Sequence, residues 1–358
     1  MKPGVRTVAV LVALVAGAAA SPVLAGAFAV GPKVGPVPGG FRPVSFTAIS
    51  DSDWWLLGSA PCKRAPCTSI VTTRDGGRSF VGLPAPRTGR VDQLRFADLH
   101  NGFAFGPELW RTHNGGETWK PVELGGNVED LTAAGGWVYA LLSTAHGSGR
   151  LLRSPAGRDA WRPVGKLVGE PFAGLWAQGS RVMVETQSRT GSSSRLLVST
   201  DSGAHFRLAG SAPPAVECQL QGVLPVIWAA CATGTESGVW RSSNGGARFI
   251  GVGGDANRSS GPSEPNSAAF GAATSTAAVY GYRQLWRTSD AGAHWRAVPG
   301  TRDALWWTYL GFTDATHGAA LGEFQGGSRL YYTTDGGASY HRVPIPGAGA
   351  LSVQPRSR

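Results

Sequence analysis

The chain has 358 residues, of which 42% are hydrophobic and only 16% are charged, where an average globular protein has roughly 25% charged residues. This much apolar surface excludes a chain that is disordered throughout, and 52 Gly with 24 Pro favour turn-rich β-structure. The formal net charge of +10 favours an anionic glycan, a cell-wall polymer or a lipid surface as partner, with a protein also considered, and a basic surface that serves only solubility is the alternative. Nucleic acid is not expected, because no run of Lys and Arg is interleaved with aromatic residues.

The N-terminus has the pattern of an export signal. Lys2 and Arg6 form a basic start, residues 7–20 are apolar, and Val23-Leu24-Ala25 resembles the small-residue pattern of a cleavage site. We expect cleavage after Ala25 and a secreted or extracytoplasmic mature chain without a transmembrane span. The alternative, an uncut membrane anchor, is disfavoured because the apolar run is shorter than the roughly 20 residues that a spanning helix needs.

The four cysteines suit an exported protein, because thiols outside the cytoplasm oxidise to disulfides. Cys62 and Cys67 lie close together in one segment, and Cys218 and Cys231 flank one expected strand-turn-strand unit. We therefore predict the local pairs Cys62–Cys67 and Cys218–Cys231. The alternative is a zinc site, which neither the spacing of these cysteines nor a nearby His cluster supports.

A short polar segment recurs along the chain. Each copy has a Ser or Thr, an Asp or Asn two positions later, a Gly two positions further and a closing aromatic residue. The copies are Thr73–Phe80, Thr112–Trp119, Ser199–Phe206, Ser242–Phe249, Thr288–Trp295 and Thr333–Tyr340. Ser154–Trp161 is a decayed seventh copy, which keeps the hydroxyl and the Trp but lacks the Asp.

These segments resemble the Asp-box, also called the bacterial neuraminidase repeat. Such a box is a hairpin corner, in which the Asp or Asn accepts hydrogen bonds from turn amides and the Gly adopts positive φ. The resemblance implies a structural role, instead of catalysis or calcium binding, for Asp75, Asn114, Asp201, Asn244, Asp290 and Asp335.

The spacing of the segments predicts the fold. Asp75 and Asp335 are six repeats apart, which gives about 43 residues per repeat, the length of a four-stranded propeller blade. The sequence therefore predicts an all-β chain with a single seven-bladed β-propeller and four antiparallel strands per blade. The expected blades are 41–86, 91–125, 127–165, 171–210, 214–253, 264–299 and 304–346. The expected organisation is a signal peptide over 1–25, a flexible leader over 26–40, the propeller over 41–350 and a tail over 351–358; residues 350–353 either extend an edge strand or belong to the tail.

A second element recurs at the expected first turn of a blade. It occurs at Phe96–Gly102 and Phe312–Gly318, and Ala48–Trp55 occupies the matching place in the first repeat. Together with Leu-Trp-Arg-Thr at 109–112 and 285–288, this is similar to the Asp-box propellers of the photosystem II assembly and stability factor type. The resemblance implies a binding or assembly scaffold, and the family's partners are not carried over to this chain.

Ligands of propellers usually meet the face formed by the loops that join strands two and three and that join one blade to the next. Basic side chains outnumber acidic ones in these loops, and Arg suits bidentate contacts with an anion. The predicted binding residues are Arg64, Arg150, Arg195, Arg283 and Arg329. The alternative is a set of scattered arginines that keep the protein soluble.

Aromatic pairs and repeated arginines raise two further questions. Trp54–Trp55 and Trp306–Trp307 suit sugar stacking or blade packing, and their place on expected inner strands favours packing. An Arg precedes the polar segment in four repeats, and its periodic placement favours a side chain packed between sheets. These arginines are Arg111, Arg153, Arg241 and Arg287.

The alternative function is that of a sialidase-like glycoside hydrolase. Phe41-Arg42-Pro43 is similar to the Phe-Arg-Ile-Pro segment of sialidases, which supplies an arginine for the substrate carboxylate, but the Ile is absent. The resemblance implies that Arg195 and Arg283 complete the clamp. Glu185 would activate Tyr282 as the nucleophile.

Two observations disfavour this enzyme. The nearest acid candidates after Arg42 are Asp51 and Asp53, which fall in the first-turn element on the wrong face. Sialidase folds have six blades, whereas the sequence predicts seven. Other classes of enzyme are disfavoured as well, because the sequence has neither a metal-ligand spacing nor a phosphate loop. We therefore predict a monomeric binding or assembly protein without catalytic residues, metal or cofactor.

Overall fold

The computed structural model describes residues 34–63, 66–143, 149–164, 172–187, 194–211, 213, 218–233, 236–254, 261–262, 264–265 and 268–347. The predicted signal peptide, residues 26–33 of the leader, Arg64 and the tail over 351–358 lie outside the described residues. In the described part, the regular elements are β-strands, which form seven antiparallel sheets.

Each of the first four sheets in chain order has four strands. The first contains β1 (Arg42–Ala48), β2 (Trp54–Ala60), β3 (Cys67–Thr73) and β4 (Val81–Leu83). The second contains β5 (Gln93–Phe96), β6 (Gly102–Phe105), β7 (Leu109–Thr112) and β8 (Lys120–Pro121). The third contains β9 (Asn127–Ala134), β10 (Trp137–Ser143), β11 (Gly149–Pro155) and β12 (Arg162–Pro163). The fourth contains β13 (Phe172–Gln178), β14 (Arg181–Gln187), β15 (Ser194–Ser199) and β16 (Arg207–Ser211).

The remaining three sheets follow the same order. The fifth contains β17 (Cys218–Val223), β18 (Val226–Ala232), β19 (Glu236–Ser242) and β20 (Ile250–Gly254). The sixth contains β22 (Ala269–Ala272), β23 (Ala278–Gly281), β24 (Trp286–Thr288) and β25 (Arg296–Ala297), and the seventh β26 (Trp306–Phe312), β27 (Gly318–Phe324), β28 (Gly327–Thr333) and β29 (His341–Val343). One expectation is corrected. Residues 264–265 form β21, which pairs with β19 of the fifth sheet and does not open the sixth blade.

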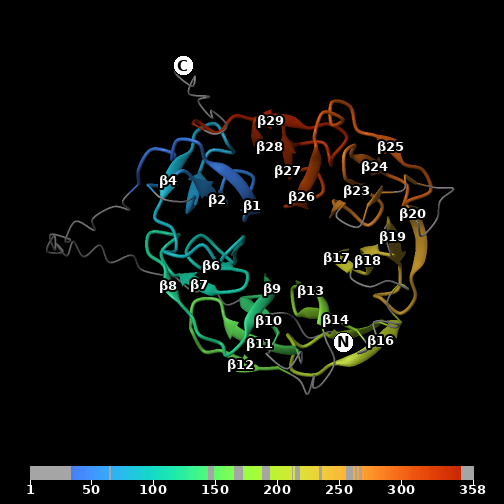
Figure 1. The fold of residues 1–358 in the computed structure, drawn as a ribbon. Helices are drawn as coiled ribbons and strands as arrows, with labels where there is room; N and C mark the ends of the chain where they lie inside the picture. Colours follow the sequence, from blue (N-terminus) through green and yellow to red (C-terminus); the bar gives the residue numbers. More distant parts are fainter. Residues whose placement is uncertain are drawn as a thin grey trace, which may run out of the picture. The chain divides into compact units, whose positions relative to one another are not determined.

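The sheets are the blades of a seven-bladed β-propeller, as the repeats predict (Figure 1). The first strand of each blade contacts the first strand of the next, in the order β1, β5, β9, β13, β17, β22 and β26, and β26 returns to β1. These seven inner strands therefore surround the centre of the ring.

The core lies between neighbouring blades. The second strand of a blade is buried on both faces, which explains continuous apolar runs such as Trp54–Leu57 and Val226–Ala230. Seven clusters of buried apolar side chains each join two neighbouring sheets. Trp54, Trp55 and Trp307 are buried in this core, as packing predicts, whereas Trp306 is 40% exposed.

The first and last blades close the ring by packing. One apolar cluster contains Trp54 of the first blade and Leu330 of the last. The Gly40 N–H donates to the Gly347 carbonyl over 2.7 Å. In the described residues each sheet consists of strands that are close in sequence, so closure here does not exchange a strand between the two ends of the chain.

In six blades the predicted polar segment forms the turn between the third and fourth strands, called the corner below. In the first corner the Thr73 hydroxyl donates to Asp75 Oδ1 (2.7 Å) and accepts the Gly77 N–H (3.0 Å). Asp75 Oδ1 also accepts the Ser79 N–H (2.9 Å). The same three bonds recur in the corners that begin at Thr112, Ser199, Ser242, Thr288 and Thr333.

The decayed copy also forms a corner, with a different set of bonds. The Ser154 hydroxyl is buried and accepts the Ala160 N–H over 3.0 Å. The Ala156 N–H donates to the Gly136 carbonyl of the first turn (2.9 Å), as the Gly76 N–H does to Ser52 (3.1 Å). An equivalent bond joins the corner to the first turn in every blade, so it is retained where the Asp is lost.

Disulfides join neighbouring strands, and arginine side chains join neighbouring blades. The disulfides Cys62–Cys67 and Cys218–Cys231 are both present, which confirms the predicted local pairing. Each of the four repeated arginines reaches from its own blade to the next. Arg111 forms an ion pair with Asp159. Arg153, Arg241 and Arg287 donate to the backbone carbonyls of Ser202, Ser275 and Gly336, respectively.

Candidate functional site

Four of the five predicted binding arginines lie in the described part of the chain. Arg150 and Arg195 are near the start of β11 and β15, Arg283 follows β23, and Arg329 is on β28. The first three are exposed, while the Arg329 guanidinium covers the Phe324 ring at 4.5 Å. All four follow the turn between strands two and three, so they share one face and are spread over four different blades.

A cavity of about 560 Å³ lies at the centre of the ring. All seven inner strands line it, and its size is within the roughly 300–1,000 Å³ of small-molecule and peptide-side-chain pockets. Gln178, Thr274 and residues 313–315 also line it, and they stand where inner strands enter their first turns. The cavity is therefore near the face of the first turns and corners, at the opposite end of the strands from the loop arginines.

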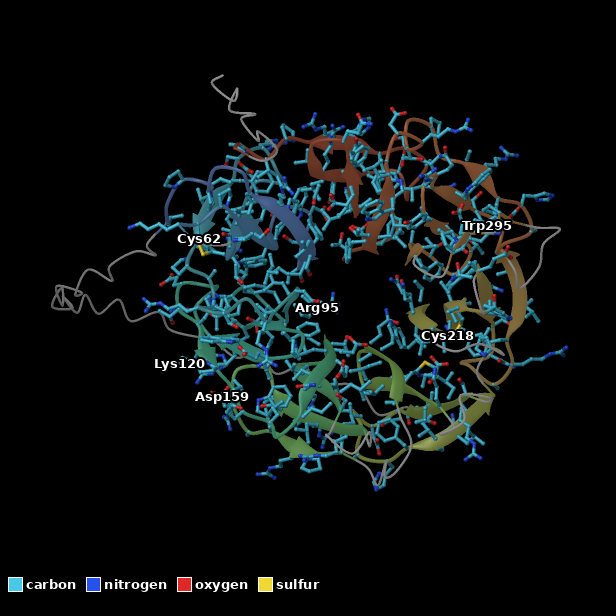
Figure 2. All side chains as sticks on the ribbon, in the orientation of Figure 1. Cys62, Arg95, Lys120, Asp159, Cys218 and Trp295 are labelled. Carbon is cyan, nitrogen blue, oxygen red and sulfur yellow. A yellow bond between two sulfur atoms is a disulfide. The ribbon has the colours of Figure 1, made fainter. Side chains whose placement is uncertain are left out.

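Arg95 is the cationic side chain among the residues that line this cavity. It projects from β5 toward the middle of the ring (Figure 2). Its Nε is buried and has no hydrogen-bond partner among the described residues. Burial raises the pKa of the Tyr309 hydroxyl on β26, and the positive charge of Arg95 and a hydrogen bond from its guanidinium to this hydroxyl oppose the shift. Arg95 thus brings a positive charge to the wall of the cavity.

The other polar groups around the cavity hold the inner strands together. Gln221 on β17 accepts the Ala272 N–H (2.9 Å) and donates to the Phe270 carbonyl (3.2 Å) of β22. Ser45 and Thr47 on β1 accept backbone N–H groups of β5. These side chains are therefore used in joining neighbouring blades.

The residues of the sialidase hypothesis have different partners. Tyr282 follows β23, and its N–H donates to Glu264 Oε2 over 3.2 Å. The same carboxylate accepts the Trp286 indole N–H (3.1 Å), and burial raises its pKa. The Tyr282 ring lies parallel to Trp306, with centroids 6.5 Å apart, while Glu185 is fully buried in the fourth blade. The carboxylate beside Tyr282 is thus Glu264, which the sequence did not single out.

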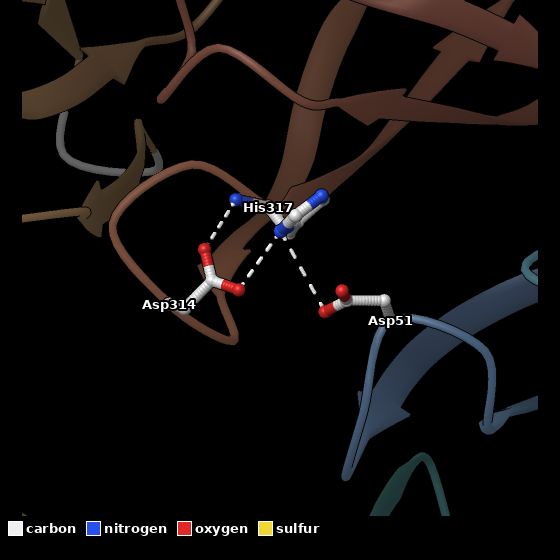
Figure 3. Close-up of side chains that lie close together, drawn as sticks. All are labelled: Asp51, Asp314 and His317. Atoms are coloured by element: carbon white, nitrogen blue, oxygen red, sulfur yellow. Dashed lines mark hydrogen bonds and ion pairs between the residues drawn. The ribbon is translucent and has the colours of Figure 1, made fainter.

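Two carboxylates and an imidazole meet where the last blade contacts the first (Figure 3). His317 Nδ1 is 2.8 Å from Asp314 Oδ2 and 3.6 Å from Asp51 Oδ1. These ligand-type atoms lie within 4.8 Å of one another, which is close enough to hold a metal ion. Asp314 also accepts the Thr316 and His317 N–H groups, and these bonds lower its pKa despite burial. Asp98 caps the matching turn of the second blade in the same way, so the arrangement is explained as a turn cap.

The corner carboxylates are occupied by their own turns. Hydrogen bonds from Ser79 and Thr73 lower the pKa of Asp75 to about 2. At Asp335 burial raises the pKa, but bonds from Ser339 and Thr333 outweigh it and lower the pKa to about 2. These bonds support the structural role that we propose for the corner Asp and Asn residues.

Replacing Asp75 and Asp335 together by Asn is expected to reduce the loss of stability in acid. A carboxyl with a lowered folded-state pKa stabilises the fold above its ordinary value near 3.8, and this contribution is lost as the pH falls toward about 2. Asn keeps the acceptor oxygen, as Asn114 and Asn244 do, and does not titrate in this range. Urea midpoints near neutral pH and at about pH 3 measure the difference. The converse variant Asn114→Asp should steepen the acid loss, and equal losses in all three proteins would contradict the prediction.

Known proteins resemble this chain in structure and not in sequence. No protein-family model matches the chain, and no curated protein matches its sequence. The solved structure of "YCF48 bound to D1 peptide" is similar, with 17% identity, a TM-score of 0.56, and coverage of 85% of this chain and 95% of that one. The shared property is the propeller fold. YCF48 from Cyanidioschyzon merolae shares it too, at 15% identity and a TM-score of 0.56 over 85% of this chain and 98% of that one.

A peptidase contains a similar propeller. The puromycin-hydrolyzing peptidase of Mycobacterium tuberculosis matches with 13% identity and a TM-score of 0.56, over 88% of this chain and 57% of that longer one. Binding proteins and enzymes thus share this architecture, so function has to be argued from the site. In the described residues, no helix has the length and apolarity to cross a membrane.

Proposed function

We propose that this chain is an exported binding or assembly propeller that holds an acidic segment of a partner protein at its central cavity. The observation that carries the proposal is Arg95, the one cation among the described residues that line a cavity surrounded by all seven inner strands. A guanidinium in such a cavity favours an anionic group, because charge-assisted hydrogen bonds are stronger than those between neutral groups. The acidic groups at the cavity are Asp130 and Asp314, and Asp314 is used in its own turn.

A protein segment fits this site better than a glycan or cell-wall polymer. One similar propeller was solved as "YCF48 bound to D1 peptide", so a peptide is a ligand that this architecture accommodates. The cavity also combines Arg95 with the half-buried Ala133, Trp176 and Ala177, which suits an acidic side chain or chain terminus with apolar neighbours.

Three parts of this proposal rest mainly on the sequence. We propose that residues 1–25 are a signal peptide cleaved after Ala25, which the two disulfides support. We propose that the mature chain is a monomer. The loop arginines are proposed as a second basic face that contacts the same partner; they are Arg64, Arg150, Arg195, Arg283 and Arg329.

Arg95→Gln is expected to weaken binding of acidic peptides by about 10- to 100-fold, the effect of one charge-assisted hydrogen-bonding group. The probe is a set of fluorescein-labelled peptides rich in Asp and Glu, measured by anisotropy with the mature chain, against the same peptides with Asn and Gln. The control is Arg207→Gln with Arg296→Gln, which removes twice the charge from exposed residues on outer strands and should leave binding unchanged. Failure of every acidic peptide to bind, or equal binding by Arg95→Gln, would reject the proposal.

A further inference from the structure

The decayed corner of the third blade differs from the other six in the length of its β-ladder. In the other blades the pairing of strands two and three ends at the corner hydroxyl, for example at Trp54 and Thr73. In the third blade the ladder continues one pair beyond Ser154, so that Trp137 lies opposite Pro155. In this blade Trp137 therefore stands one pair beyond the corner hydroxyl, at the end of the hairpin.

This extension lines a second cavity of about 270 Å³, called the blade-three pocket. Its walls are apolar groups of Trp137, Pro155 and Ala160, together with three arginines. The arginines are Arg153, Arg158 and Arg162. The volume is slightly below the roughly 300 Å³ at which pockets for drug-sized ligands begin, so the pocket suits one small molecule.

The charges around the blade-three pocket are uncompensated. The Arg153 guanidinium lies 4.4 Å from the centroid of the Trp137 ring and donates to the Ser202 carbonyl. Arg158 and Arg162 are exposed, and within the described part of the chain neither forms an ion pair. Among the described residues that line the pocket, none carries a carboxylate.

The acid of this corner is engaged elsewhere. Asp159 directly follows Arg158, but its carboxylate forms an ion pair with Arg111 of the second blade. It also lies 3.4 Å from His113 Nε2. Asp159 is at the boundary with the second blade, on the outer part of the ring (Figure 2). The pocket therefore keeps a positive charge although its corner contains an acid.

We propose that the blade-three pocket binds a small organic anion with a flat or apolar body and one carboxylate or phosphate group. The body packs against the indole of Trp137 and the ring of Pro155, and the oxyanion accepts hydrogen bonds from Arg158 and Arg162. None of the described residues that line the pocket is on an inner strand, and the site does not depend on the proposed role of Arg95.

Fluorine NMR of the mature chain containing 5-fluorotryptophan tests this inference. The chain has 13 Trp, and the Trp137 signal is assigned as the one that Trp137→Phe removes. Phenyl phosphate and benzoate are the probes, and benzyl alcohol is the neutral counterpart. We expect at least one anion to shift the Trp137 signal in a saturable manner, and the two probes distinguish phosphate from carboxylate.

The arginines are tested with a matched pair of double variants. Arg158→Gln with Arg162→Gln should weaken binding at least tenfold. Arg207→Gln with Arg296→Gln removes the same charge from exposed residues that follow the closing aromatic of intact corners, as Arg162 does, and should leave binding unchanged. The inference is overturned if neither anion shifts the signal, if benzyl alcohol binds as well as the anions, or if both double variants weaken binding equally.

Discussion

Gly77→Ala is expected to lower the free energy of unfolding by about 2–5 kcal/mol. Gly77 has φ of 82°, and a left-handed conformation costs other residues roughly 1–2 kcal/mol. An added Cβ would lie 2.6 Å from Cζ3 of the buried Trp54 and 2.9 Å from Cγ1 of Val343 in the last blade. The substitution therefore strains the corner and the contact that closes the ring.

The preceding glycine is the matched control for this effect. Gly76 has φ of 69°, but its added Cβ would come no closer than 3.2 Å, to the Asp51 carbonyl. Ser202 and Ala291 occupy the equivalent position with positive φ in two other corners. Gly76→Ala should thus lower the free energy of unfolding by only about 1 kcal/mol. The cost of positive φ is partly offset because Ala reduces the conformational entropy of the unfolded chain. Urea unfolding compares the two, and equal losses would contradict the predicted overlap with Trp54.

Thr333→Val is expected to cost about 2–3 kcal/mol, because it removes the buried hydroxyl of the last corner. That hydroxyl accepts the Gly337 N–H at 3.0 Å and the Asp335 N–H at 3.3 Å, and donates to Asp335 Oδ1 at 2.8 Å. Val has the same shape and offers no acceptor, so the buried Gly337 N–H loses its partner.

The neighbouring threonine separates this effect from a general loss of polarity. Thr334 is exposed, and Thr334→Val should stay within about 0.5 kcal/mol of the parent protein. Thermal and urea unfolding of both variants measure the difference. If Thr333→Val cost no more than Thr334→Val, the corner hydroxyl would not have the role given to it here.

The blades were predictable because their corners are local. The hydroxyl, the carboxylate and the two N–H groups of a corner lie within seven consecutive positions, as Thr73 to Ser79 show, so the pattern is visible in the sequence and its spacing gives the blade length. The same holds for Cys218 and Cys231, which are cross-strand neighbours on β17 and β18. Even the decayed corner was recognisable, since Ser154 kept its buried hydroxyl.

The candidate site could not be predicted, because it depends on contacts between distant blades. Arg95 and Tyr309 meet only when the second and seventh inner strands face the same cavity, and neither residue belongs to a motif. Glu264 reaches Tyr282 because β21 pairs back to the fifth blade, which no local pattern indicates. The loop arginines could be assigned to a face by topology, but not to a common pocket.

A crystal structure of the mature chain with its tightest-binding acidic peptide tests the central claim most directly. Our account predicts a peptide carboxylate within hydrogen-bonding distance of the Arg95 guanidinium, in the cavity between the seven inner strands. A peptide bound on the loop face, with the cavity around Arg95 and Tyr309 unchanged, would contradict it.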